Sequence, residues 1–400
     1  MPSAADAYAA ARERSRHREL HAFESSLPFG LDEFQREACM ALERGHGVLV
    51  AAPTGSGKTV VGEFAIHLAL EQGRKCFYTT PIKALSNQKY RDLVERYGAE
   101  RIGLLTGDNS INGEAPVVVM TTEVLRNMIY AGSSTLNDLG YVVMDEVHYL
   151  ADRFRGAVWE EVIIHLPASV TIVALSATVS NAEEFGAWLA TVRGQTEIVL
   201  EEHRPVPLWQ HVMASRRLLD LFVDDDQEVV NPELVRMARE DERRERGTSR
   251  PPRGGRRGRS LHAPYRTDVV EELERAGLLP AIVFIFSRAG CDDAVRQCLD
   301  AGLRLNTRIE RDEVVAELLE ATRGIPDDDL AALGYGEWRE ALERGIAAHH
   351  AGLLPAFKEV VERLFQRGLI KVVFATETLA LGINMPARTV AIERFSKFGA

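Results

Sequence analysis

The chain has 400 residues, of which 48 are Lys or Arg and 59 are Asp or Glu, so its net charge is −11. This excludes a protein that coats nucleic acid through bulk positive charge, and any such contact must come from a local groove or tail. At ~150 residues per domain, the length predicts two or three domains.

Short apolar segments alternate with amphipathic ones over most of the chain. In the first half, the expected strands are 48–52, 75–79, 117–120, 141–144 and 171–175. They are apolar on both faces, which is typical of a buried parallel sheet. The alternation resumes with expected strands at 281–286, 346–349, 371–375 and 389–392. The pattern predicts an α/β protein with two domains of similar build, each a mostly parallel sheet flanked by helices.

The composition changes between these two regions. Two apolar segments, 218–223 and 229–230, flank three aspartates and predict a small hairpin with an acidic tip. Residues 243–259 then contain eight arginines and one acid, too polar to bury a core of their own. We consider two interpretations, a flexible linker and a tethered basic arm that holds phosphates loosely. The expected organisation is a tail or helix (1–27), a first domain (28–207), a hairpin and linker (208–265) and an incomplete second domain (266–400).

A glycine-rich turn directly follows the first expected strand and precedes an expected helix. Gly55 and Gly57 allow backbone N–H groups to face a phosphate, and the helix N-terminus adds partial positive charge. Lys58 would reach the β- and γ-phosphates of a nucleotide, and Thr59 would bind Mg²⁺. The first position of this phosphate-loop pattern is Ala52 rather than glycine.

An acidic pair follows the strand expected at 141–144. Asp145 stands where a carboxylate would hold Mg²⁺ through water, and the adjacent Glu146 would orient and deprotonate an attacking water. Together with Lys58 and Thr59 in the same alternating unit, the pair predicts a site that hydrolyses a nucleoside triphosphate.

Further polar loops follow the expected strands and are predicted to form one continuous face, because open α/β sheets bind ligands at the carboxyl ends of their strands. In the second domain, such loops would complete a cleft for the nucleotide and a track for a strand. Adjacent His349 and His350 point to opposite faces of a strand, so we do not expect them to share a metal ion. The four scattered cysteines form no CxxC pair and favour a reducing, cytoplasmic compartment. No apolar run is long enough for a membrane span, and no secretory signal is recognisable.

These residues together resemble the superfamily-two DExH-box helicases. The match is best to the superkiller-type RNA helicases that assist exosome-like degradation, and within them to an actinobacterial group. It covers about 28–400, and its motifs are LPFGLDEFQ (27–35), APTGSGKT (52–59), TPIKALSNQ (80–88), DEVH (145–148), RGAVWEE (155–161), SAT (176–178), HRPVPL (203–208), HHAGLLP (349–355) and ATETLALGINMPA (375–387).

The resemblance assigns roles to individual residues. It implies that Phe29 stacks on adenine, that Gln35 reads the edge of the base, and that His148 completes the catalytic set. The implied ATP loop comprises Ala52, Pro53, Thr54, Gly55, Ser56, Gly57, Lys58 and Thr59, with Gly382 from the second domain. The residues that would couple the nucleotide state to the grip on the strand are Ser176, Ala177 and Thr178. The implied contacts to the nucleic-acid backbone are Pro81, Lys83, Gly107, Thr122, Arg126, Ser287, Arg288, Thr376 and Thr378.

The resemblance also implies an activity. Two RecA-like domains would close on ATP and Mg²⁺ and step from 3′ to 5′ along single-stranded RNA, within or beside an RNA-degradation complex. Contacts to the backbone alone predict sequence-tolerant binding with a steep salt dependence. We expect no membrane partner and no oligomer.

One departure from the family and two alternatives remain open. The family's arginine-finger motif would lie after Ala400, so we expect the front portion of a longer helicase that hydrolyses ATP poorly by itself. The alternatives are a DNA-repair helicase of the same superfamily and a nucleotide-gated nucleic-acid-binding module without turnover. A transporter-type ATPase is disfavoured by the lack of an LSGGQ-like segment.

Overall fold

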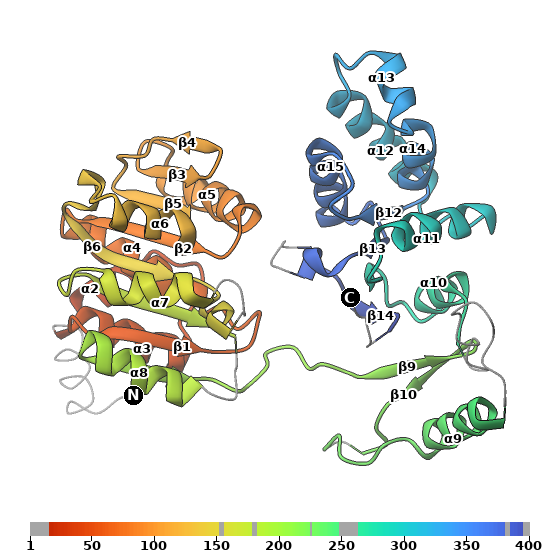
Figure 1. The fold of residues 1–400 in the computed structure, drawn as a ribbon, viewed down its shortest axis with the longest axis horizontal. Helices are drawn as coiled ribbons and strands as arrows, with labels where there is room; N and C mark the ends of the chain where they lie inside the picture. The colour runs from red at the N-terminus through yellow and green to blue at the C-terminus, as the bar shows by residue number, and fades with distance from the viewer. Residues whose placement is uncertain are drawn as a thin grey trace, which may run out of the picture. The chain divides into compact units, whose positions relative to one another are not determined.

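The computed structural model describes residues 16–151, 156–177, 182–224, 226–247, 263–380 and 385–394. The chain divides into two compact units, Met1–Leu208 and Trp209–Ala400, which Figure 1 shows as ribbons. Within the described residues, no helix is long and apolar enough to cross a membrane.

The first unit is built on an eight-stranded sheet with the strand order β4-β3-β5-β2-β6-β7-β1-β8. All neighbouring strands are parallel except β3 and β4. The strands are β1 (Gly47–Ala51), β2 (Lys75–Thr80), β3 (Ile102–Thr106), β4 (Asn109–Ile111), β5 (Val117–Thr121), β6 (Leu139–Met144), β7 (Thr171–Ser176) and β8 (Thr196–Leu200). The helices are α2 (Arg18–Ser25), α3 (Glu33–Glu43), α4 (Thr59–Glu71), α5 (Lys83–Tyr97), α6 (Thr122–Tyr130), α7 (Gly156–His165) and α8 (Ala182–Arg193), with short 3₁₀ turns η1 (Ser134–Leu136) and η2 (Val147–Ala151).

The apolar residues of this sheet form one core on each face, because successive side chains of a strand point to opposite sides. Tyr78 belongs to the core that the sheet forms with α2, α3, α4 and α5. The preceding residue, Phe77, belongs to the core formed with α6, α7 and α8. The helices therefore cover both faces of the sheet and leave the ends of the strands free for loops.

The second unit contains a smaller, fully parallel sheet with the order β12-β13-β11-β14. Its strands are β11 (Ala281–Phe284), β12 (Ile346–His349), β13 (Val372–Ala375) and β14 (Thr389–Ile392). The helices α12 (Arg308–Ala321), α14 (Tyr335–Glu343) and α15 (Pro355–Gln366) pack on one face, and α10 (Arg266–Arg275) and α11 (Arg288–Asp300) pack on the other. Two short elements complete the unit, α13 (Asp327–Ala332) and η3 (Glu377–Ala380). Both sheets confirm the predicted α/β class, and their architecture is consistent with RecA-like domains.

Three strands of the first sheet were not predicted from the sequence. Strands β3, β4 and β8 lie at or next to the sheet's edges, where the apolar runs are shorter and interrupted. In β3, Gly103 interrupts the run, and a Cβ at this position would lie 2.2 Å from the carbonyl oxygen of Asn112. This glycine thus allows the chain after β4 to pass close to β3.

The segment after residue 208 differs from its predicted form in two respects. The hairpin consists of β9 (His211–Ala214) and β10 (Arg217–Asp220), earlier than predicted. The predicted acidic turn contributes only one antiparallel bridge, between Phe222 and Val230. Helix α9 (Pro232–Gly247) was also not predicted, and it contains the first five residues of the arginine-rich segment. The remainder of that segment, 248–259, lies outside the described residues.

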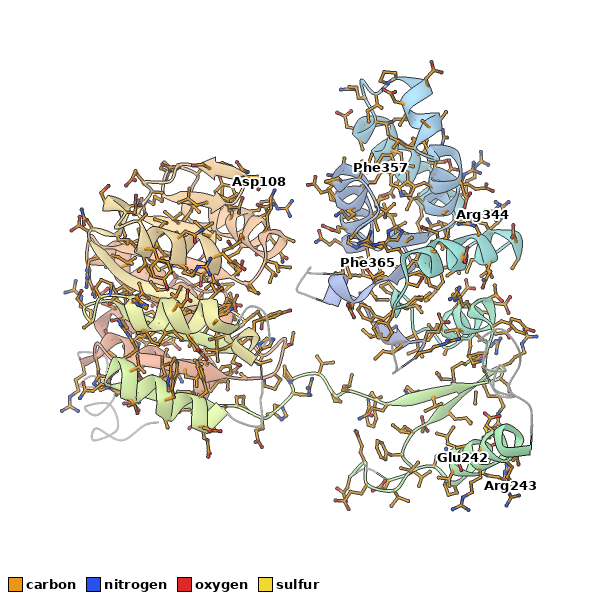
Figure 2. The ribbon with its side chains drawn as sticks, viewed as in Figure 1. Asp108, Glu242, Arg243, Arg344, Phe357 and Phe365 are labelled. Carbon is orange, nitrogen blue, oxygen red and sulfur yellow. The ribbon has the colours of Figure 1, made fainter. Side chains whose placement is uncertain are left out.

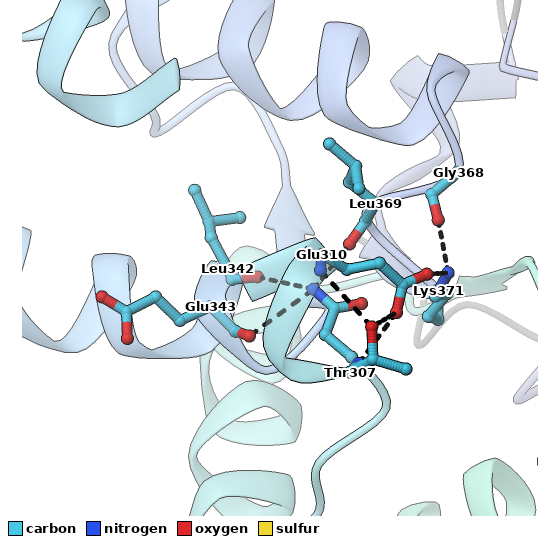
Figure 3. A network of polar contacts seen from close by, with 8 residues as sticks. Thr307, Glu310, Leu342, Glu343, Gly368, Leu369 and Lys371 are labelled. Atoms are coloured by element: carbon cyan, nitrogen blue, oxygen red, sulfur yellow. Dashed lines mark hydrogen bonds and ion pairs between the residues drawn. The ribbon is translucent and has the colours of Figure 1, made fainter. Parts of the chain in front are cut away.

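A polar network secures the start of α12 in the second unit (Figure 3). Thr307 and Glu310 form a capping box, in which the Glu310 carboxylate accepts the Thr307 backbone N–H at 2.8 Å. The Lys371 ammonium binds the same carboxylate at 2.5 Å and the Gly368 carbonyl oxygen at 2.6 Å. The Asn306 amide donates to the carbonyl oxygen of Leu369 at 2.9 Å. This network lies at the amino end of β13, opposite the strand ends that carry the candidate site.

We expect Glu310→Gln to lower the stability of the protein by about 1 kcal/mol at pH 7, because it weakens the capping box and removes the ion pair with Lys371. Lys371 is the main reason that the pKa of Glu310 falls to about 2 from its ordinary value of 4.5. A lowered pKa stabilises the fold above the ordinary pKa, and this contribution is lost as the pH falls toward 2. Urea denaturation should therefore show a wild-type advantage that shrinks below about pH 4.5. Glu313→Gln, which removes an exposed ion pair with Arg367, is the control with little expected effect.

Candidate active site

The predicted site residues of the first unit lie along one edge of the large sheet, at the carboxyl ends of its strands. The phosphate loop follows β1, the acidic pair follows β6 and the predicted coupling residues follow β7, and these three strands are neighbours in the order β6-β7-β1. The predicted nucleic-acid contacts follow the neighbouring strands β3-β5-β2. The sheet order thus separates the predicted residues into two adjacent groups, which we call the nucleotide half and the nucleic-acid half of the edge after their predicted roles, and these halves meet between β2 and β6.

The phosphate loop adopts the conformation that its glycines allow. Gly55 and Gly57 have φ angles of +86° and +82°, in the left-handed region that favours glycine. Lys58 directly precedes α4 and is 6% exposed. The hydroxyl oxygen of Ser56 is buried without a hydrogen-bond partner among the described residues. The loop therefore offers a helix N-terminus, a buried cation and an unpaired hydroxyl to an anionic ligand.

Gln35 holds the phosphate loop from the side. Its amide nitrogen donates to the carbonyl oxygens of Ser56 at 3.3 Å and Gly57 at 3.1 Å, and its amide oxygen accepts the backbone N–H of Asp32 at 3.0 Å. Phe29 precedes this segment and is 52% exposed, so its ring is accessible for stacking. The roles of Phe29 and Gln35 toward a base remain predictions, but Gln35 connects their segment to the loop.

The acidic pair has a defined geometry at the end of β6. The Asp145 carboxylate accepts the Tyr78 hydroxyl at 2.7 Å and the backbone N–H of Glu146 at 2.9 Å. Glu146 has a φ of +56°, a conformation unusual for a residue with a side chain and frequent at functional sites. Burial raises the pKa of the Glu146 carboxyl, the neighbouring Asp145 raises it further, and Lys58 opposes both effects. Lys58 is thus close enough to the Glu146 carboxyl to act on it electrostatically.

His148 connects the acidic pair to the loop after β7. Its Nδ1 accepts the backbone N–H of Ala177 at 3.4 Å and lies 3.2 Å from a carboxylate oxygen of Glu146. Burial lowers the pKa of His148, and Lys58 lowers it further, which favours the neutral ring that can accept this hydrogen bond. Ser176 is buried, and its carbonyl oxygen accepts the backbone N–H of Ala52 at 3.1 Å. Of the predicted coupling residues, Ser176 therefore bonds to the start of the phosphate loop and Ala177 bonds to His148 beside the acidic pair. Thr178 lies outside the described residues.

The residues present fit ATP and Mg²⁺. The unpaired hydroxyl of Ser56, the glycine conformations and the buried Lys58 suit phosphate groups. Thr59 at the start of α4 would supply an oxygen ligand of the kind that Mg²⁺ prefers, and the Asp145 carboxylate would hold the ion directly or through water. Gly382, the predicted ATP contact from the second unit, lies outside the described residues.

The nucleic-acid half of the edge contains both exposed and buried candidates. Lys83 at the start of α5 and Gly107 after β3 are exposed, whereas Pro81 is buried. Thr122 is 1% exposed, and its hydroxyl donates to the Thr80 carbonyl oxygen at 3.3 Å. The Thr122 side chain is thus engaged within the fold.

Two carboxylates pair with the basic candidates of this half. Arg126 on α6 lies 3.8 Å from the carboxylate of Glu161 on α7. Lys83 forms an ion pair with Asp108, which follows β3 and is labelled in Figure 2. Asp108 also accepts the hydroxyl of Thr106, and Lys83 is the main reason that its pKa is lowered. The sequence motifs gave no indication of either pairing.

The candidates of the second unit follow the adjacent strands β12, β13 and β11. The Ser287 hydroxyl caps α11 by accepting the backbone N–H of Gly290 at 3.1 Å, and Arg288 next to it is exposed. Thr376 follows β13, and its backbone N–H donates to the carbonyl oxygen of His349 at 3.3 Å. Thr378 lies in η3, and its side chain is outside the described part of the chain.

The two histidines at the end of β12, His349 and His350, bind different carboxylates. His349 Nε2 lies 2.8 Å from Glu362 on α15, and His350 Nε2 lies 2.9 Å from Asp292 on α11. These helices lie on opposite faces of the small sheet, so the two rings point apart as predicted. Among the described residues, no group of His, Cys, Asp or Glu is arranged to hold a metal ion with three or more ligands.

Comparison with known proteins identifies the family. A model of the DEAD/DEAH box helicases matches residues 32–185, which contain both the phosphate loop and the acidic pair. The chain contains a DEAD/DEAH box helicase domain. The chain is 63% identical over 391 residues to the probable helicase HelY of Mycobacterium leprae. The aligned region covers 95% of the chain and 42% of that protein.

Two human helicases are similar over nearly the same range. Superkiller complex protein 2 is 41% identical over 381 residues, covering 92% of the chain and 30% of that protein. Exosome RNA helicase MTR4 is 40% identical over 376 residues, covering 93% of the chain and 35% of that protein. These similarities confirm the predicted superkiller-type DExH-box family. The chain spans less than half the length of each of these relatives.

Proposed function

We propose that this chain is the core of an ATP-dependent RNA helicase that moves from 3′ to 5′ on single-stranded RNA. The observation that carries the proposal is the division of one sheet edge into adjacent nucleotide and nucleic-acid halves. The names of two relatives, a superkiller complex protein and an exosome RNA helicase, support RNA as the substrate and an RNA-degradation complex as the partner.

The chemistry of ATP hydrolysis is assigned to the nucleotide half. Lys58 and the backbone amides of the loop bind the β- and γ-phosphates, and Thr59 and Asp145 hold Mg²⁺. The bound Mg²⁺ would neutralise charge that develops on the transferred phosphoryl group. Glu146 orients the attacking water and accepts its proton. Its position next to Asp145 places the base beside the metal ligand.

The coupling of hydrolysis to RNA is assigned to the loop after β7. The Nδ1 atom of His148 accepts the backbone N–H of Ala177 and also lies next to the Glu146 carboxylate, so one ring nitrogen connects the two residues. A change at the γ-phosphate that moves Glu146 would therefore also shift His148 and, through it, residues 176–178. Backbone contacts at the neighbouring strand ends would hold RNA without reading its sequence, so the affinity should fall steeply with salt.

The compartment is also part of the proposal. All four cysteines are buried and unpaired, which supports a reducing compartment such as the cytoplasm.

Unwinding of duplexes with a single overhang by the full-length protein tests the proposal. The substrates are an RNA duplex with a 3′ overhang, the same duplex with a 5′ overhang, and the matching DNA duplexes. We expect ATP-dependent unwinding of the 3′-tailed RNA and little unwinding of the 5′-tailed RNA. Preferential unwinding of DNA would assign the protein to DNA repair, and ATP binding without any unwinding or hydrolysis would leave only a nucleotide-gated binding module.

We expect Asp108→Asn to strengthen RNA binding by about threefold at low salt. The substitution removes a negative charge from the RNA-facing edge and releases Lys83 from its ion pair, and the gain should shrink as salt screens the charges. Fluorescence anisotropy with a labelled single-stranded RNA measures the effect. Asp92→Asn changes the net charge by the same amount on α5, where Asp92 pairs with Lys89. Equal effects of both variants would show that only net charge matters.

A further inference from the structure

Tyr78 occupies the boundary between the two halves of the sheet edge. It lies in β2, is fully buried, and donates its hydroxyl to Asp145 Oδ2 at 2.7 Å. Strand β2 carries Pro81 and Lys83 at its end, whereas Asp145 follows the neighbouring strand β6. The hydrogen bond thus crosses from a strand of the nucleic-acid half to the acidic pair.

The ring of Tyr78 is held from several sides. A Cβ at Gly62 on α4 would lie 3.2 Å from the Tyr78 ring, so the absence of a side chain there allows the helix to pack closely on it. The Lys89 ammonium lies 5.4 Å from the ring centroid. Because the ring is confined in this way, its hydroxyl group is held in one position.

The hydroxyl donates to a carboxylate that accepts one other hydrogen bond from the residues that the structure describes. Asp145 Oδ1 accepts the Glu146 backbone N–H at 2.9 Å, so Tyr78 and this amide fix the two oxygens separately. Each oxygen keeps a further lone pair for water or metal.

We propose that Tyr78 is a positioning residue that orients the Asp145 carboxylate for Mg²⁺. The inference rests on the proposed function, because it requires Asp145 to hold the metal that accompanies ATP. Groups that hydrogen-bond to metal ligands typically change metal affinity by about 10- to 100-fold when removed. The sequence motif that begins at Thr80 does not include Tyr78.

The test is the Mg²⁺ dependence of nucleotide binding, measured with a fluorescent ATP analogue and without turnover. We expect Tyr78→Phe to raise the Mg²⁺ concentration for half-maximal tight binding by about 10-fold, and to leave the affinity in EDTA unchanged. The matched control is Tyr141→Phe, since Tyr141 lies on β6 and its hydroxyl bonds Gln72 at 3.2 Å, away from Asp145. Its Mg²⁺ dependence should equal that of the wild type.

A double-mutant cycle distinguishes positioning from a general effect on the fold. In an Asp145→Asn background, adding Tyr78→Phe should not shift the Mg²⁺ dependence further, because the oriented carboxylate is already lost. A wild-type Mg²⁺ requirement in Tyr78→Phe, or an equal shift in Tyr141→Phe, would overturn the inference alone. Failure of the wild-type protein to bind the analogue at any Mg²⁺ concentration would instead overturn the proposed function.

Discussion

Replacing Lys58 with alanine is expected to weaken ATP binding by about 30-fold to more than 1,000-fold. Truncating one partner of a buried, hydrogen-bonded charge pair costs about 2–5 kcal/mol, and each 1.4 kcal/mol is a factor of ten. Lys58 is 6% exposed and directly precedes α4, so its ammonium would form such a pair with the phosphates of bound ATP. Isothermal titration with a non-hydrolysable ATP analogue measures the loss.

A second lysine provides the control for Lys58. Lys75 is the first residue of β2, so it lies at the amino ends of the strands, away from the phosphate loop, and it pairs with Glu114. Lys75→Ala should leave the ATP affinity at the wild-type value. If Lys58→Ala also retained wild-type affinity, the loop after β1 would not be the phosphate site.

Glu146→Gln should retain ATP binding and lose hydrolysis by about 10²- to 10⁴-fold, the usual contribution of general acid–base catalysis. The amide keeps the shape of the side chain but cannot accept the proton of the attacking water. Steady-state phosphate release in the presence of single-stranded RNA measures the loss, and analogue titration checks that binding is kept. Glu71→Gln, at the exposed end of α4, should retain full turnover. Unchanged turnover in Glu146→Gln would remove Glu146 as the base.

In the large sheet, the strands that could be predicted are those in the middle. Strand β5 is apolar on both faces because helices cover both sides, and such runs are recognisable without a structure. Strand β8 is paired on one side only, and Glu197 within it is exposed, so its pattern resembles a loop. Helix α9 is highly charged and half-exposed, and its composition alone suggests a linker.

The candidate site could be predicted where one short motif contains the whole arrangement. The loop at 52–59 forms its turn from its own glycines, so local sequence was sufficient. The contacts of Tyr78 with Asp145 and of Lys83 with Asp108 join residues 67 and 25 positions apart. Such contacts depend on the order of strands in the sheet, which the motifs do not contain.

The most direct test of the account is a structure of the protein with Mg²⁺ and a non-hydrolysable ATP analogue. It should place the β- and γ-phosphates on the backbone amides ahead of α4, with Lys58 on the phosphates and Mg²⁺ between Thr59 and Asp145. Glu146 should face the γ-phosphate through a water molecule. A triphosphate bound at another edge of the sheet, with Asp145 and Glu146 remote from it, would contradict the assignment of ATP hydrolysis to this site.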